Sequence, residues 1–121
     1  KMARRFRKVM GGGMRQAGYL AAAGIYALDH HIERLREDNQ SAMELGKTLE
    51  SLPWVDSVRP VQTNIVIFDL RPPLTAASFL KKLAEKGINA SPFGPMTVRF
   101  VTHLDYTEAM LIRTLEVLNS L

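Results

Sequence analysis

The most unusual stretch of the sequence is a run of three glycines flanked by basic residues. Gly11, Gly12 and Gly13 stand between Lys8 and Arg15, and an alanine-rich segment follows them. If a helix begins after the glycines, their backbone N–H groups are uncovered at its positive end and can bind an anion such as phosphate, while the basic side chains add charge. The alternative is a flexible hinge between two helices. The residues alone favour the hinge, because glycine more often serves to give the backbone conformational freedom than to bind a ligand.

Arg99 is the second candidate, because it interrupts an otherwise apolar strand. Strand alternation divides the side chains of this segment into two faces, with Arg99, Val101 and His103 on one and Val98, Phe100 and Thr102 on the other. A guanidinium on a sheet face needs a carboxylate, and it can bind one from the protein or from a substrate in bidentate geometry. Without further information, an internal salt bridge or an exposed edge position is the simpler interpretation. His103 shares the face of Arg99, but a histidine at a strand end more often hydrogen-bonds a local turn.

Several other classes of site lack their usual residues. His30 and His31 are adjacent, so on a helix they point about 100° apart and cannot easily share a metal ion. The sequence has no histidine pair at i and i+4, no Walker-type loop, no nucleophile elbow and no dinucleotide fingerprint. It also has no cysteine, which excludes disulfides, thiolate metal sites and a cysteine nucleophile. We therefore expect no metal site, and hydrolase or nucleotide-dependent chemistry is disfavoured.

The composition is that of a soluble globular domain. With 121 residues, of which 46% are hydrophobic and 23% charged, the chain suits one modest domain and is short for a cofactor-dependent enzyme acting alone. Its start at Lys1 suggests a piece of a larger protein. No membrane span or secretion signal is visible, and a cytoplasmic location fits.

The positive charge of the chain gathers at its start. The net charge is +4, and six basic residues fall within the first fifteen positions: Lys1, Arg4, Arg5, Arg7, Lys8 and Arg15. Such a cluster can bind nucleic acid, membrane phosphates or a phosphorylated small molecule, or it can be a solvated helix face, which is the simplest interpretation of the cluster alone.

Hydrophobic periodicity predicts helices first and then alternating strands and helices. The predicted elements are helices over 1–10, 14–28 and 31–52, strands over 55–59, 64–70 and 97–103, a helix from Thr75 to Gly87, an extended segment from Ile88, and a final helix opened by a capping box of Asp105 and Glu108. Dense β-branched content predicts that the strand over 64–70 is buried on both faces. The order of elements predicts an α/β fold, an α+β sandwich with helices on one sheet face and the other face free.

Four stretches of the sequence resemble one enzyme family in the same order. They are RRFRKVMGGGMRQAG at 4–18 with its alanine-rich continuation, QTN at 62–64 with the strand that follows, INASP at 88–92, and VRFVTHLD at 98–105. Together they closely resemble the part of low-specificity threonine aldolases that follows the cofactor-binding lysine. The resemblance covers essentially the whole chain.

The resemblance implies a pyridoxal-phosphate enzyme of the aminotransferase-like fold, fold type I, with a large cofactor domain and a small C-terminal domain. Such enzymes form dimers of dimers and cleave L-threonine or L-allo-threonine to glycine and acetaldehyde. Residues 1–30 then correspond to the end of the large domain and the connecting helix, and residues 31–121 to the small domain. Arg99 corresponds to the arginine that binds the substrate's α-carboxylate. Lys8 and Arg15 look like the basic pair that reaches a cofactor phosphate, that of the neighbouring subunit.

The same resemblance places the lysine that holds the cofactor upstream of Lys1, and Lys81, Lys82 and Lys86 lie on a predicted surface helix. We therefore expect the chain alone to be inactive and its parent to be a homo-oligomer acting on a small β-hydroxy amino acid, without nucleic acid or membrane. Two alternatives stay open: a related β-eliminating lyase or amino-acid racemase of the same fold, and a basic module that binds nucleic acid or an acidic partner.

Overall fold

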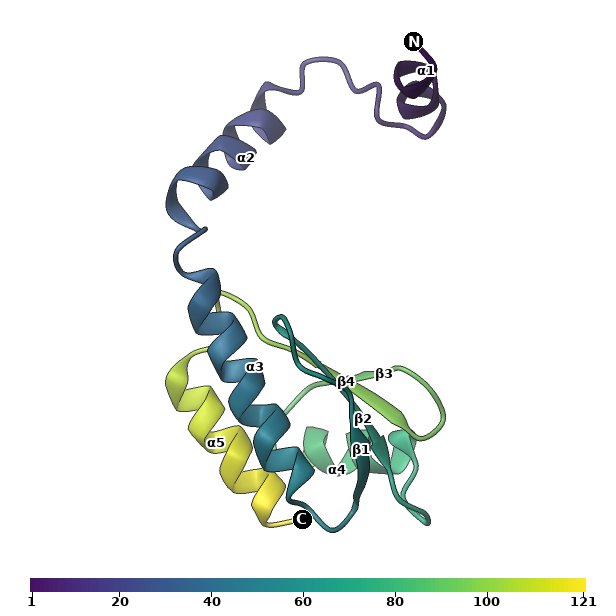
Figure 1. Ribbon diagram of the computed structural model, residues 1–121, viewed down its shortest axis with the longest axis vertical. Helices are drawn as coiled ribbons and strands as arrows, with labels where there is room; N and C mark the ends of the chain where they lie inside the picture. The colour runs from purple at the N-terminus through teal and green to yellow at the C-terminus, as the bar shows by residue number, and fades with distance from the viewer. The chain divides into compact units, whose positions relative to one another are not determined.

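The computed structural model describes all residues, 1–121, and they divide into two compact units. The first unit is Lys1–Arg34 and the second is Leu35–Leu121. Each unit has its own secondary structure, shown in Figure 1. No helix of either unit has the length and apolar character that crossing a membrane requires.

The first unit contains helices α1 (Met2–Val9) and α2 (Gly18–His30). Helix α1 ends in a Schellman motif, in which Gly11 adopts φ +85° and donates its N–H to the Lys8 carbonyl over 3.2 Å. The N–H of Gly12 reaches back to the Arg7 carbonyl over 2.7 Å. Glycine accepts this left-handed conformation without steric penalty, which explains why the helix stops here. The prediction of a short helix ended by glycine is confirmed.

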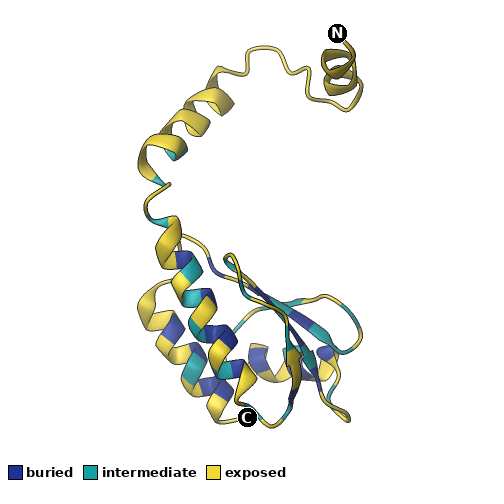
Figure 2. Ribbon diagram, viewed as in Figure 1, coloured by how far each residue is buried: buried dark blue, intermediate teal, exposed yellow.

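Helix α2 begins later than predicted and has no buried residue. The sequence predicted a helix over 14–28, but α2 starts at Gly18 and none of its residues is buried (Figure 2). Tyr19, for example, is 93% exposed. The apolar side chains of this helix are therefore not buried within their own unit, although the Tyr26 ring stacks on that of His30.

The second unit is an antiparallel sheet with helices on one face. Its elements in chain order are α3 (Leu35–Glu50), β1 (Val55–Val58), β2 (Ile65–Leu70), α4 (Ala76–Glu85), β3 (Ser91–Pro92), β4 (Thr97–Val101) and α5 (Glu108–Asn119). The strands lie in the order β1-β2-β4-β3, and every neighbouring pair is antiparallel. The predicted fold class is confirmed, with helices packed on one sheet face.

The core of this unit lies between the sheet and the three helices. Alternate residues of β2 and β4 are buried, and they pack with buried residues of α3, α4 and α5: Val66, Phe68, Leu70, Val98, Phe100, Ala42, Leu45, Leu49, Ala76, Phe79, Leu83, Leu111, Val117 and Leu118. Phe68 is central, because its ring meets those of Trp54, Phe79 and Phe100. The other residues of β2 are only half-buried or exposed. The prediction that this strand is buried on both faces is therefore wrong for this unit.

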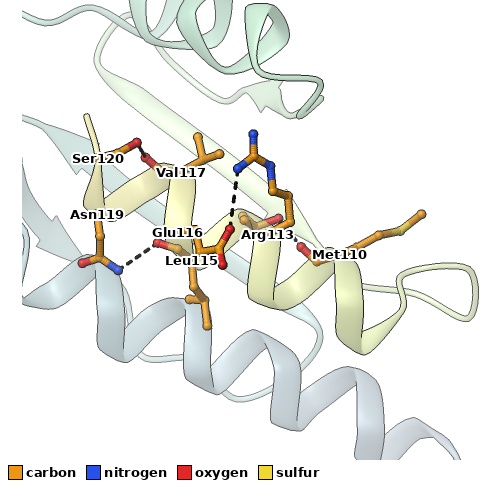
Figure 3. Close-up of polar contacts among 8 residues, drawn as sticks. Met110, Arg113, Leu115, Glu116, Val117, Asn119 and Ser120 are labelled. Carbon is orange, nitrogen blue, oxygen red and sulfur yellow. Dashed lines mark hydrogen bonds and ion pairs between the residues drawn. The ribbon is translucent and has the colours of Figure 1, made fainter.

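Short polar contacts set the ends of the last two helices. Thr75 caps α4 in a capping box with Ser78. Helix α5 is capped by Thr107, whose hydroxyl accepts the N–H of Met110, so the predicted cap at Asp105 is wrong by two residues. At the other end of α5 the side chains of Asn119 and Ser120 donate to backbone carbonyls one turn or less before them (Figure 3). The Val117 carbonyl, which lies in the last turn of the helix, also accepts the backbone N–H of Ser120 over 3.0 Å.

Candidate functional site

The open face of the sheet carries two arginines in one cross-strand row. Arg99 of β4 pairs with Ile67 of β2 on one side and with Ser91 of β3 on the other. Beyond the end of β1, the backbone N–H of Arg59 donates to the Ile67 carbonyl over 2.9 Å. Arg59, Ile67, Arg99 and Ser91 therefore form a row across the sheet. The predicted alternation of β4 is confirmed, since Val98, Phe100 and Thr102 are buried on the helical side.

The Arg99 guanidinium has no acidic or hydrogen-bonding partner. Its Nε is buried without a hydrogen bond, and no carboxylate lies within 4.0 Å of the group. Leaving a buried donor unpaired typically costs about 1–3 kcal/mol. Such a group marks a place where a partner from elsewhere fits. Neither of the simpler interpretations from the sequence matches the structure, because Arg99 has no internal salt bridge and β4 lies between β2 and β3 rather than at the sheet edge.

One acid shares this face, but it is bound to hydroxyl groups. Asp69 lies two residues from Ile67 on β2, and its Oδ1 accepts a hydrogen bond from Thr97, its register partner on β4. Its Oδ2 accepts from the Ser57 hydroxyl over 3.2 Å. Ser57, Asp69 and Thr97 thus form a second row beside that of Arg99. Each carboxylate oxygen of Asp69 has a hydroxyl donor, and this acid forms no ion pair with the guanidinium.

An aromatic ring covers the arginine row. The Arg99 guanidinium carbon lies 5.9 Å from the centroid of the Phe93 ring, and the corresponding carbon of Arg59 lies 5.6 Å from the same centroid. Sequence analysis missed Phe93 and Arg59. Phe93 stands in a turn where no periodicity applies, and Arg59 follows the last residue of its strand.

The histidines do not join this site. His103 lies beyond β4, where its Nδ1 accepts the N–H of Asp105 over 3.3 Å, which is the local-turn role that the sequence left open. Further along, the Tyr106 hydroxyl donates to Thr114 over 2.9 Å. Burial raises the pKa of the Tyr106 phenol, and its hydrogen bond with Thr114 opposes that shift. No group of three or more histidine, aspartate or glutamate side chains is arranged to hold a metal ion.

The glycine-rich segment does not have the geometry of the anion-site alternative. The N–H groups of Gly11 and Gly12 are already bonded to carbonyls of α1, and the glycines lie at the C-terminal, negative end of that helix. An anion site formed by these two backbone groups is therefore not present. What remains are the side chains of Lys8 and Arg15, which are exposed and have no ion-pair partner. They belong to the first unit and Arg99 to the second, so neither unit alone brings the three together.

Comparison with known proteins points to one group of enzymes. The family model described as beta-eliminating lyase matches residues 1–72. The low specificity L-threonine aldolase of Escherichia coli (strain K12) is 42% identical over 112 residues, covering 92% of this chain and 32% of that protein. The low-specificity L-threonine aldolase 1 of Arabidopsis thaliana is 34% identical over 116 residues, covering 93% of this chain and 32% of that protein. The chain thus spans about a third of the length of these curated relatives.

Solved structures show the same fold at lower sequence identity. The cystine C-S lyase C-DES, in complex with its product cysteine persulfide, matches with a TM-score of 0.64 and 24% identity, covering 84% of this chain and 28% of that one. A mutant of C-DES with glycine covalently linked to its PLP cofactor matches with a TM-score of 0.63, at the same identity and coverage.

Proposed function

The chain belongs to the beta-eliminating lyase family, and from this premise we propose that it is the C-terminal part of a pyridoxal-phosphate-dependent aldehyde-lyase. The proposed reaction of the whole protein is cleavage of L-threonine or L-allo-threonine to glycine and acetaldehyde. Support comes from relatives named low-specificity L-threonine aldolase, which match over 92–93% of this chain.

The observation that carries the proposal is the unpartnered Arg99 guanidinium on the open sheet face. An amino-acid substrate brings an α-carboxylate, and a guanidinium binds a carboxylate through two parallel hydrogen bonds. The buried Nε of Arg99 has no donor role inside the protein, and Asp69 is occupied by hydroxyl groups. In the proposal, Arg99 therefore holds the substrate by its carboxylate and restricts the rotation of the bound amino acid, which lowers the entropy lost on reaching the transition state.

The cofactor phosphate is assigned to Lys8 and Arg15. Both are cationic and have no acidic partner, which suits a phosphate group that carries up to two negative charges. We assign them to the cofactor of a neighbouring subunit in a homo-oligomer, a tetramer as the resemblance implies. When bound, pyridoxal phosphate supplies the electron sink for breaking a bond at Cα. The residues of this chain supply charge and orientation.

We propose that the chain alone is inactive. Its lysines near the sheet, Lys81, Lys82 and Lys86, are exposed on or just after α4. None lies in a position to hold a cofactor beside Arg99. The lysine that does so belongs, in this proposal, to the two thirds of the relatives that lie outside the match. The lack of cysteine agrees with a cytoplasmic location.

A second candidate reaction is β-elimination. The family model carries that description, and a C-S lyase is among the structural matches. We do not propose nucleic-acid binding, because a phosphate ligand already accounts for the basic pair Lys8 and Arg15.

The experiment uses the complete protein that contains this chain, purified with pyridoxal phosphate. Acetaldehyde release from L-threonine and L-allo-threonine is measured beside pyruvate release from L-serine and L-cysteine. The proposal expects acetaldehyde as the main product and loss of that activity when the cofactor is removed. Pyruvate without acetaldehyde would instead establish β-elimination. If the protein releases neither acetaldehyde nor pyruvate, both reactions are refuted.

A further inference from the structure

Phe93 projects from the turn that joins β3 to β4. Its backbone N–H donates to the Thr97 carbonyl over 2.9 Å, and that of Gly94 donates to the same carbonyl over 3.2 Å. The turn is tight, since a Cβ atom at Gly94 would lie 3.1 Å from the Thr97 hydroxyl oxygen. The same threonine that holds Asp69 therefore also anchors the turn that carries the aromatic ring.

The Phe93 ring lies against two like charges. The guanidinium carbons of Arg59 and Arg99 lie 5.6 Å and 5.9 Å from its centroid, within the range of a cation–π contact. Neither arginine has a carboxylate within ion-pair distance. Two such cations in one row repel each other, and the negative face of the ring opposes that repulsion. The ring is thus the group that fixes where the Arg99 guanidinium lies before a ligand arrives.

We propose that Phe93 is a positioning residue for Arg99, and that Arg59 on the same ring adds a second positive charge that attracts the substrate carboxylate. The inference rests on the proposed function in one respect, namely that Arg99 receives a carboxylate. It requires no particular bond to be broken afterwards. Half of Phe93 is exposed, so the ring can be altered without opening the core.

The test uses the complete protein with its cofactor and two replacements at one position. Phe93→Leu keeps an apolar side chain but removes the π face, and Phe93→Tyr keeps the π face. The dissociation constant for glycine is read from the change in cofactor absorbance. Glycinamide, which lacks the carboxylate, is the matched control ligand, and its dissociation constant is measured in the same way. Ile112→Ala, which trims a side chain that is 53% exposed on α5, is the control variant.

We expect Phe93→Leu to weaken glycine binding about fivefold and to leave glycinamide binding within about twofold. Phe93→Tyr should restore glycine binding, and KM for an amino-acid substrate should rise in Phe93→Leu while kcat changes little. Arg59→Gln should weaken glycine binding by a smaller factor and reduce its dependence on salt.

Three results from the Phe93 variants would overturn the inference. They are unchanged glycine binding in Phe93→Leu, equal losses for glycine and glycinamide, and failure of Phe93→Tyr to restore binding. Absence of glycine binding by the unaltered protein would overturn it as well. Failure of acetaldehyde release with Phe93-dependent glycine binding would instead refute the proposed reaction and leave the positioning role in place.

Discussion

The Thr97 hydroxyl donates a hydrogen bond to Asp69 across strands β2 and β4, on the sheet face that carries Arg99. Ser57 donates to the other carboxylate oxygen. A carboxylate and a guanidinium therefore share one face without an ion pair, and hydroxyl groups hold the carboxylate in the neighbouring row. The chain keeps Arg99 available by occupying the acid that could neutralise it.

Thr97→Val tests this relationship. Without the hydroxyl, Asp69 loses a donor and we expect its carboxylate to turn toward Arg99, where it competes with the substrate carboxylate. KM for an amino-acid substrate should rise about three- to tenfold, consistent with the roughly 1 kcal/mol of a typical hydrogen bond gained inside the protein. Steady-state kinetics of the complete protein provide the measurement. Adding Asp69→Asn to Thr97→Val should return KM toward its original value, and a double variant as weak as the single one would contradict the relationship.

Arg99→Gln should separate binding from stability. The guanidinium makes no internal ion pair and its Nε is a buried unpaired donor, so we expect the free energy of unfolding to stay the same or to rise by no more than about 1–3 kcal/mol. Loss of a buried charged contact to a ligand is worth about 2–5 kcal/mol, so kcat/KM should fall at least thirtyfold. Arg99→Lys should recover little, because an ammonium cannot form the two parallel bonds.

The control for Arg99 is Arg71→Gln. Arg71 is an exposed arginine of the same unit that contacts Asp56 over 3.7 Å. Its replacement should leave kcat/KM unchanged. A similar loss of kcat/KM in both variants, or clear destabilisation by Arg99→Gln, would show that Arg99 has a structural role.

The sequence sufficed for features that depend on local periodicity. Alternation along β4 placed Arg99 opposite the core, and Thr75 marked the start of α4. The contact between Thr97 and Asp69 was beyond its reach, because it depends on the register between strands 28 residues apart. The prediction for β2 failed because β-branched residues alone do not tell one-sided from two-sided burial, although Asp69, on the face of Ile67, was one sign that this face stays open.

The glycines illustrate a different limit. A glycine can end one helix in the left-handed conformation or expose its N–H at the start of the next, and the letters are the same in both cases. The structure assigns Gly11 and Gly12 to the end of α1. The contact of Phe93 with the arginines could not be predicted from the sequence for a related reason. The position of its ring depends on a turn whose geometry is set by hydrogen bonds to the Thr97 carbonyl.

Gly13→Ala tests the role assigned to Lys8. A Cβ atom at Gly13 would lie 2.9 Å from the Lys8 Cγ, so the lysine side chain must leave its present position. The dissociation constant of pyridoxal phosphate in the complete protein should rise about three- to tenfold, and Lys8→Gln should cause a similar loss. The double variant should lose no more than Lys8→Gln alone, because both changes act on one contact.

The matched control for Gly13 is Gly18→Ala. A Cβ atom there meets nothing within 4 Å, and alanine favours the helix by up to about 1 kcal/mol. Cofactor affinity should stay the same in this variant. Additive losses in the Gly13 and Lys8 double variant would mean that the glycine acts through something other than Lys8.

Tyr106 should make the second unit sensitive to alkaline pH. Burial raises the pKa of its phenol in the folded state above the value near 10 that an unfolded chain has. Between the unfolded and folded pKa values, the folded state holds more protons than the unfolded state, so stability falls as pH rises. The contribution is fully present below about pH 10 and is lost as pH rises through the folded pKa. Tyr106→Phe should therefore flatten the decline of the unfolding free energy above about pH 10, as measured by urea unfolding.

At neutral pH the same variant loses the hydrogen bond to Thr114, whose hydroxyl still donates to the Met110 carbonyl over 2.8 Å. We therefore expect destabilisation of no more than about 1 kcal/mol there. Tyr19→Phe, which removes a phenol that is 93% exposed, controls for the loss of one ionisable tyrosine. The prediction would be contradicted if the unfolding free energy declined equally steeply above about pH 10 in Tyr106→Phe and in the unaltered protein. A phenol that stays neutral in the folded state lowers the stability at pH values where the phenol of the unfolded chain ionises.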